Sequence, residues 1–274
     1  MEPTSAWQVK RHRAEEHRAE LQSTVSDYLA RGYRIAAESN ATSNETYYRL
    51  HVLEPIPARI SAIIGDVLHN LRSALDCLSL ELARRHLGRD LNLSEERGAQ
   101  FPISKSHKDF DTFFNRPGRA DLFSRRERMA MQSTQPGWVF DLAAQSGIQS
   151  GDRDEEVEHD SLWLLQQLSN ADKHRRVLVT FMHVDQVWWA SDAHSEYGWR
   201  WGRTPFHDGQ VVGVLTDTKG YGPPELREEV ELRVNEPSAP RASEWDVNSL
   251  MGQLSGRVER ALWQTCKSWS ESPV

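Results

Sequence analysis

Six polar side chains that could carry chemistry lie within eleven positions of the stretch "IGDVLHNLRSALDC": Asp66, His69, Asn70, Arg72, Ser73 and Asp76. A histidine can transfer protons near neutral pH, and a guanidinium can stabilise negative charge on an oxyanion or a phosphorane. The residue types therefore indicate acid–base chemistry, in which His69 moves a proton, Arg72 holds an anionic group and Asp76 orients them. Asn70 and Ser73 would contact the substrate.

The same pattern also has a structural interpretation. Arg72 and Asp76 are four residues apart, a spacing at which opposite charges pair on one face of a helix. They would then form a buried pair that fixes helix packing, or belong to a solvated helix face. The sequence leaves the structural and the catalytic interpretations open.

A second polar cluster, "SNADKHRRV" over residues 169–177, stands where a predicted helix should end. Cations at the carboxyl end of a helix interact favourably with its dipole, which explains the cluster without any function. In the functional interpretation, the cluster faces the first one and completes a pocket. His174 would then transfer protons, and Lys173 and Arg175 would bind the substrate.

Metal binding would use His69, Asp76 and His174 as a set of two histidines and one carboxylate. The chain has no H-E-x-x-H motif, and its other histidines are dispersed. It also lacks a P-loop, G-x-G-x-x-G and G-x-S-x-G, so we expect no glycine-rich nucleotide-binding loop. We expect no metal and no cofactor, and a metal-dependent hydrolase is kept as an alternative.

The other reactive and aromatic residues favour packing. Cys77 lies within a long predicted helix with no helix N-terminus beside it, so an inert thiol is expected. Four tryptophans fall in a region of short strands, where aromatic side chains usually pack across strands but could also stack on bases. These tryptophans are Trp188, Trp189, Trp199 and Trp201.

Composition narrows the class of protein. The net charge is −7 over 274 residues, so any site for a polyanion must be local. There are two cysteines and no run of 18 apolar residues, and the N-terminus has no apolar signal-peptide core. We expect a cytoplasmic protein without a membrane segment.

Hydrophobic periodicity predicts the elements that position these residues. The longest helix spans 58–87 and should end at Gly88, with apolar residues at the helical period. Further helices are expected at 5–31, 105–114, 119–132 and 155–171, after an acidic loop at 145–160. A helix at 243–270, capped by Ser243, is expected to return to the bundle.

Strands are expected in two places. Residues 33–54 predict a small hairpin, in which Tyr48, Leu50 and Val52 alternate, and residues 176–236 predict an antiparallel sheet. The fold class is therefore α+β, a helical bundle over 5–175 with a substantial antiparallel sheet in the C-terminal half. We expect residues 1–274 to form one composite domain.

Four sequence blocks resemble a family of uncharacterised bacterial proteins that is frequent in actinobacteria. These blocks are "IGDVLHNLRSALDCL", "FPIS", "QPGW" and "LQQLSNADKHRRVL". The long helix is also similar, more distantly, to HEPN (higher eukaryotes and prokaryotes nucleotide-binding) proteins, which carry an Arg-x4-His motif. Arg72 matches the arginine of that motif, whereas Cys77 stands where the histidine would fall.

The HEPN resemblance implies a helical bundle that acts on RNA as a homodimer. Many HEPN proteins are metal-independent endoribonucleases of toxin and phage-defence systems, with the Arg and His in a groove between two protomers. Because a neutral thiol cannot replace an imidazole, His69 or His174 would supply the proton transfer, or the chain would bind RNA without cutting it. The alternative is a non-catalytic interaction protein whose polar residues fix its own structure.

Overall fold

The computed structural model describes residues 5–40, 42–138, 153–173, 179–189, 197–201, 207–217 and 226–270, without the side chains of residues 153, 179–189, 197–201, 217, 226–229 and 268–270. The fold is mixed α and β with antiparallel strands, which confirms the predicted α+β class. The main helices are α1 (Ala6–Leu29), α2 (Ala58–Leu87), α8 (Ser161–Lys173) and α9 (Val247–Ser270). Shorter helices are α3 (Leu93–Gly98), α4 (His107–Phe114), η1 (Ala120–Leu122), α5 (Arg125–Ser133), α7 (Arg153–His159) and η3 (Pro240–Glu244).

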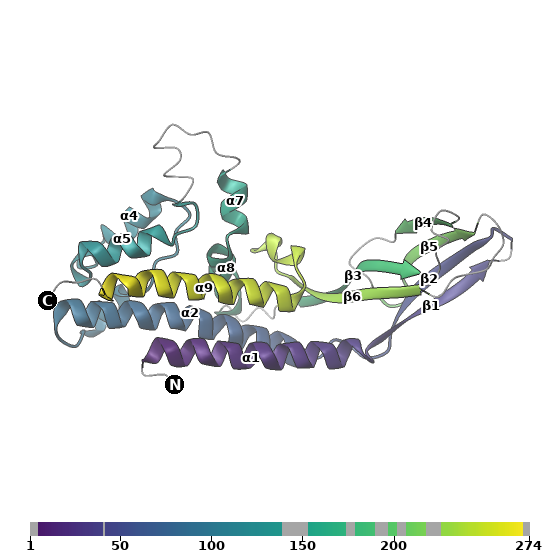
Figure 1. The fold of residues 1–274 in the computed structure, drawn as a ribbon, viewed down its shortest axis with the longest axis horizontal. Helices are drawn as coiled ribbons and strands as arrows, with labels where there is room; N and C mark the ends of the chain where they lie inside the picture. Colours follow the sequence, from purple (N-terminus) through teal and green to yellow (C-terminus); the bar gives the residue numbers. More distant parts are fainter. Residues whose placement is uncertain are drawn as a thin grey trace.

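Helix α2 is the centre of the bundle and has the predicted bounds. It packs against α1, α8 and α9, and Figure 1 shows α1 and α9 running alongside it. Its apolar stripe is fully buried, and burial of each large aliphatic side chain contributes about 1.5–3 kcal/mol. The helix ends at Gly88, whose φ of 65° lies in the left-handed region that glycine adopts without strain.

The strands form an arm that projects beyond the helices (Figure 1). They are β1 (Tyr33–Asn40), β2 (Glu45–Val52), β3 (Val179–Trp189), β4 (Tyr197–Trp201), β5 (Val211–Asp217) and β6 (Leu226–Asn235). One sheet has the order β1-β2-β5-β4, and β3 pairs with β6 in a second. The hairpin at 33–54 is therefore not a separate element, because β5 pairs with β2 and joins the hairpin to the C-terminal strands.

The arm joins the bundle at a tightly packed turn. Tyr28, near the end of α1, is buried, and its hydroxyl donates a hydrogen bond of 3.0 Å to the Glu54 carbonyl. The Gly32 carbonyl accepts hydrogen bonds from the Leu53 and Glu54 amides. A Cβ atom at Gly32 would collide with the Tyr28 ring, so only glycine fits here. Burial raises the pKa of Tyr28 to about 12.

Two helices predicted as continuous are broken by capping residues. The helix expected at 155–171 is α7 and α8, which meet at Asp160, whose carboxylate accepts a 2.7 Å hydrogen bond from the Leu162 amide. The acidic loop predicted at 145–160 is helical from 153 to 159, and residues 145–152 lie outside the described residues. Likewise, Ser124 caps α5 and separates it from η1 within 119–132.

Side-chain caps also account for two other differences at helix ends. Helix α9 begins at Val247 rather than near Ser243, because the Asp246 carboxylate accepts hydrogen bonds from the amides of Asn248 and Ser249. Helix α3 has no counterpart in the prediction. Asn92 and Glu95 form its capping box, in which each side chain accepts from the other residue's backbone N–H.

One cluster of buried apolar residues extends from the bundle into the arm, where it includes Tyr48, Leu50 and Leu215. Along β2, Thr46, Tyr48 and Leu50 are buried, as the predicted alternation requires, whereas Val52 is only half-buried. Among the residues that the structure describes, no helix combines the length and apolarity needed to cross a membrane.

Candidate functional site

Arg72 lies largely inside the protein, with 9% of the residue exposed. Its Nη2 atom donates hydrogen bonds to Asp76 Oδ1 at 2.9 Å and to the Phe101 carbonyl at 2.7 Å. Its Nη1 atom donates a third to Gln166 Oε1 at 3.2 Å. A buried guanidinium is costly unless it is paired and hydrogen-bonded, and these three acceptors meet that requirement.

Asp76 and Arg72 together hold the backbone of Phe101. Asp76 Oδ1 accepts a 3.0 Å hydrogen bond from the Phe101 amide while it also pairs with Arg72. Phe101 is 1% exposed and begins the extended segment 101–104, which belongs to neither sheet. The ion pair on α2 therefore satisfies the backbone polar groups that a strand partner would otherwise satisfy.

Gln135 holds the other end of this extended segment. Its Oε1 accepts a 2.9 Å hydrogen bond from the Ser104 amide, and its Nε2 donates one of 3.0 Å to the Pro102 carbonyl. Gln135 is 5% exposed and belongs to the block "QPGW". We call Arg72, Asp76, Gln135 and Gln166, with the backbone of 101–104, the Arg72 network.

Helix α8, which carries the start of the second polar cluster, contacts α2 at two points. Gln166 on α8 accepts from Arg72, and its amide donates a 3.2 Å hydrogen bond to Asn170. Six residues beyond Gln166 on α8, Asp172 lies against Gly65 of α2, where a Cβ atom would be 2.9 Å from Asp172 Oδ1. A glycine within α2 thus allows α8 to approach closely.

The other predicted residues of α2 lie at or near the surface, except Asn70. The imidazole of His69 is exposed, and its Nε2 lies 3.4 Å from the Ser73 hydroxyl. Asn70 is buried, and its amide donates to the Asp66 carbonyl of the same helix at 2.8 Å. The Asn70 amide therefore bonds its own helix rather than a neighbouring element.

The predicted residues around the end of α8 are described only in part. Lys173 is exposed and is the last residue of α8, where its charge complements the helix dipole. His174 and Arg175 lie outside the described residues, and so do the side chains of the four tryptophans in β3 and β4. Of the predicted catalytic residues, the structure pairs Arg72 with Asp76, and Arg72 also contacts Gln166 on α8.

The described residues bear on the reactivity of Cys77 and on metal binding. The Cys77 thiol is half-buried, and this burial raises its pKa, which disfavours a reactive thiolate at neutral pH. Within the described ranges, no three His, Cys, Asp or Glu side chains are grouped so that they could hold a metal ion. The proposed set of His69, Asp76 and His174 includes one residue outside those ranges.

Sequence reasoning missed the side chains that complete the site. Gln135 and Gln166 stand inside two of the quoted blocks, so the blocks pointed to them, although no spacing indicated their partners. Arg257 on α9 was missed entirely. Its Nη2 atom donates a 2.6 Å hydrogen bond to the Thr134 carbonyl and pairs with Asp160 at 3.3 Å, which ties α9 to the block that contains Gln135.

Comparisons with known proteins found no match to this chain. The chain matches no protein-family model, no curated protein and no solved structure.

Proposed function

We propose that the chain is a non-catalytic interaction protein, in which the Arg72 network holds a helical platform that carries the β-strand arm. The observation behind this proposal is that the guanidinium of Arg72 donates to Asp76, Phe101 and Gln166 of its own chain. An arginine that holds substrate phosphate must offer those donors to the ligand instead. The network joins α2, segment 101–104 and α8, so its role is to fix their positions.

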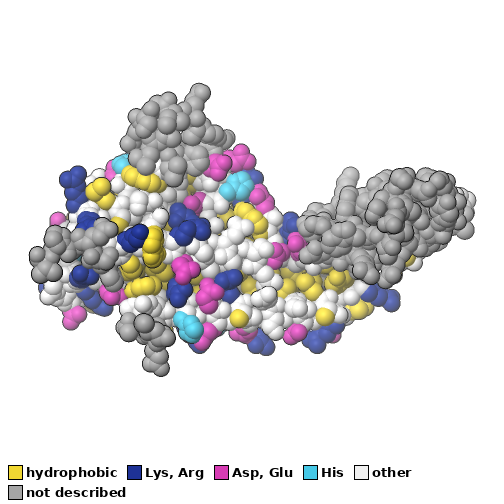
Figure 2. Space-filling view, viewed as in Figure 1, with side chains coloured by type: hydrophobic (Ala, Val, Ile, Leu, Met, Phe, Trp, Pro, Cys, Tyr) yellow, Lys and Arg dark blue, Asp and Glu magenta, His cyan; other side chains and the backbone are white. Residues whose placement is uncertain are grey.

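The projecting arm supports an interaction role. Its strands extend away from the helices, so the arm offers a surface beyond the bundle (Figure 1). On the face of the bundle drawn in Figure 2, basic side chains are interspersed with acidic ones. Mixed charges of this kind favour a protein partner over a long polyanion, whose phosphates require a basic surface.

The test of this proposal combines cleavage and stability. Purified wild-type protein and Arg72→Ala are incubated with single-stranded and hairpin RNA in EDTA, and both are melted under the same conditions. We expect no cleavage by either protein and a lower melting temperature for Arg72→Ala. Cleavage by wild type that Arg72→Ala abolishes, with an unchanged melting temperature, would contradict the proposal.

A second candidate function is a metal-independent endoribonuclease of the HEPN type. The observation that favours it is the exposed imidazole of His69, which lies beside the Ser73 hydroxyl and within one helical turn of Arg72 on α2. In this function His69 transfers protons, with His174 as the second candidate, and the exposed Lys173 contacts the RNA backbone. In this function Arg72 does not contact the RNA but holds α2 and α8 in place.

The matched control for this candidate is another histidine on the same helix. His86 is exposed in the last turn of α2, away from the Arg72 network. The nuclease candidate predicts that His69→Ala abolishes cleavage in EDTA while His86→Ala retains it, and that both melt like wild type. It also predicts a homodimer, which light scattering after size-exclusion chromatography measures directly. Equal cleavage by the two variants would eliminate His69 as the proton-transfer group.

A further inference from the structure

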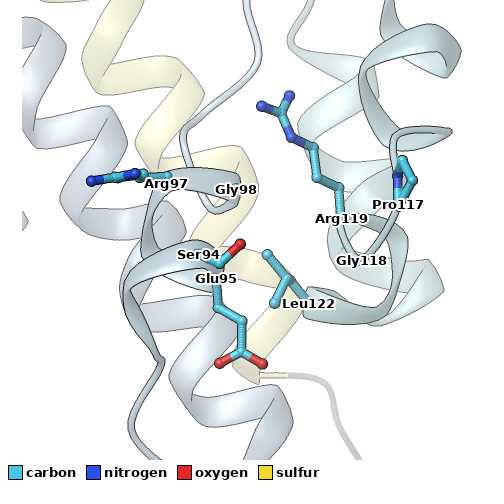
Figure 3. A pocket seen from close by; sticks show the side chains of 8 residues that line it. All are labelled: Ser94, Glu95, Arg97, Gly98, Pro117, Gly118, Arg119 and Leu122. Atoms are coloured by element: carbon cyan, nitrogen blue, oxygen red, sulfur yellow. The ribbon is translucent and has the colours of Figure 1, made fainter.

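A separate cavity lies between α3 and the turn that precedes η1, on residues that the proposed function does not use. Its volume is about 270 Å³, and it is lined by Ser94, Glu95, Arg97, Gly98, Pro117, Gly118, Arg119 and Leu122. In Figure 3 the α3 residues form one wall, residues 117–119 form the facing wall, and Leu122 lies between them. The polar character of this lining distinguishes the cavity from an ordinary packing defect.

Arg119 is the cation that this cavity leaves without a counter-ion. Its Nη1 atom is buried and has no hydrogen-bond partner, and no described carboxylate pairs with it. The guanidinium lies over the Phe113 ring, with its carbon 4.2 Å from the ring centroid. This stacking positions the planar donor group but satisfies none of its N–H groups. A buried N–H group without an acceptor is costly for the free protein, and an oxygen ligand that reaches Nη1 would remove that cost.

The carboxylate in the lining does not neutralise Arg119. Glu95 accepts two hydrogen bonds from Arg89, at 2.7 and 2.8 Å, and in Figure 3 its carboxylate points away from Arg119. Its charge is therefore already paired outside the cavity. The remaining charges of the lining are Arg97 and Arg119, so the cavity is suited to an anion.

The backbone keeps the cavity open on both sides. Residues 116–119 form a turn, closed by a 3.2 Å hydrogen bond from the Arg119 amide to the Arg116 carbonyl. Gly118 has a φ of 78°, and no heavy atom lies within 4 Å of the Cβ position there. On the opposite wall, a Cβ at Gly98 would lie 3.3 Å from Leu122 and narrow the cavity.

We propose that this cavity binds a small oxyanion, a phosphate or carboxylate group, with Arg119 as its main ligand. The Ser94 hydroxyl, which points toward the facing wall in Figure 3, supplies a neutral donor. Arg97 is exposed and in Figure 3 points away from Arg119. In this orientation its charge attracts an anion from a distance, and rotation of its side chain would allow direct contact. The planar fork of Arg119 can donate two parallel hydrogen bonds to either kind of group. The cavity is a binding site and requires no chemical step.

The test uses calorimetric titration of the full chain with inorganic phosphate and, separately, with acetate, at constant ionic strength. Arg119→Gln should weaken the preferred anion at least about tenfold, as expected for the loss of a charge-assisted pair of hydrogen bonds. The matched control is Arg116→Gln, which removes an exposed charge from the same turn but outside the lining, and it should change the affinity less than about twofold. Ser94→Ala, at the opposite wall, should weaken binding to an intermediate extent.

The two anions identify the source of the ligand chemistry. Stronger binding of phosphate assigns a phosphoryl group, and stronger binding of acetate assigns a carboxylate. If Arg119→Gln and Arg116→Gln weaken anion binding equally, the proposal is overturned, because the loss would then reflect the change in overall charge and not a specific contact with Arg119. Absence of binding of either anion to the wild-type protein would also overturn it. If Arg119→Gln melts well below wild type, Ser94→Ala and Arg119→Lys provide the same comparison, since Lys keeps the charge but loses the planar fork.

Discussion

Replacement of Arg72 by alanine should destabilise the protein by about 3 kcal/mol, because it leaves a partly buried carboxylate without its counter-ion. The Arg72 side chain is 11% exposed and that of Asp76 is 27% exposed. Breaking a fully buried pair costs about 3–5 kcal/mol, and the partial exposure of Asp76 places this pair at the lower end. The change also leaves the Phe101 carbonyl and the Gln166 amide oxygen without a donor, which lowers the stability of the protein further.

Thermal unfolding followed by circular dichroism measures this loss. A change of 3 kcal/mol in a chain of this size corresponds to a fall in melting temperature of roughly 6–12 °C. The matched control is Arg13→Ala, which removes an ion pair to Glu16 of similar length, 2.8 Å, between side chains that are 58% and 46% exposed. An exposed pair contributes about 0–1 kcal/mol, so the control should melt close to wild type.

A double-mutant cycle separates the ion pair from the other contacts of Arg72. If Arg72 and Asp76 stabilise one another, the double alanine variant should lose less stability than the sum of the two single variants, by about 0.5–3 kcal/mol. The reasoning fails if Arg72→Ala loses no more stability than Arg13→Ala, since the network would then contribute nothing that a surface pair does not.

Three further perturbations test other parts of the structure. Gly32→Ala should destabilise the protein by about 1–3 kcal/mol, because the new methyl group collides with the buried Tyr28 ring. Gly256→Ala on α9 should instead stabilise it by about 0.5–1 kcal/mol, because the nearest heavy atom to the Cβ position is 3.9 Å away and alanine favours helix; the two melting temperatures should move in opposite directions. The Arg89 guanidinium and the Asn92 amide lower the pKa of Glu95 to about 2 from its ordinary 4.5. The stability that this carboxylate contributes is present above pH 4.5 and lost as the pH falls toward 2, so Glu95→Gln should make the melting temperature less sensitive to acid in that range.

The local elements could be predicted because their signals lie within one turn or one strand. The apolar residues of α2 repeat at the helical period over thirty residues, and Gly88 marks its end, so both bounds followed from the sequence. The breaks at Asp160 and Ser124 were not predicted, since one capping carboxylate or hydroxyl decides them within otherwise helical composition. The joining of β2 to β5 was also missed, because pairing across more than 150 residues leaves no local pattern.

The structural and the catalytic interpretations of Arg72 differ in where the other N–H donors of its guanidinium point. The sequence around Arg72 does not determine that direction. The pairing with Asp76 follows from helix geometry at a separation of four residues. The bonds to Phe101 and Gln166 span 29 and 94 residues, and they favour the structural interpretation because they use donors that a substrate would need. Quoted blocks that lie far apart in the chain thus meet in one hydrogen-bonded network. The network accounts for Arg72 and Asp76 among the polar residues of α2, while a nuclease function would have to act through His69, which remains exposed, or through His174.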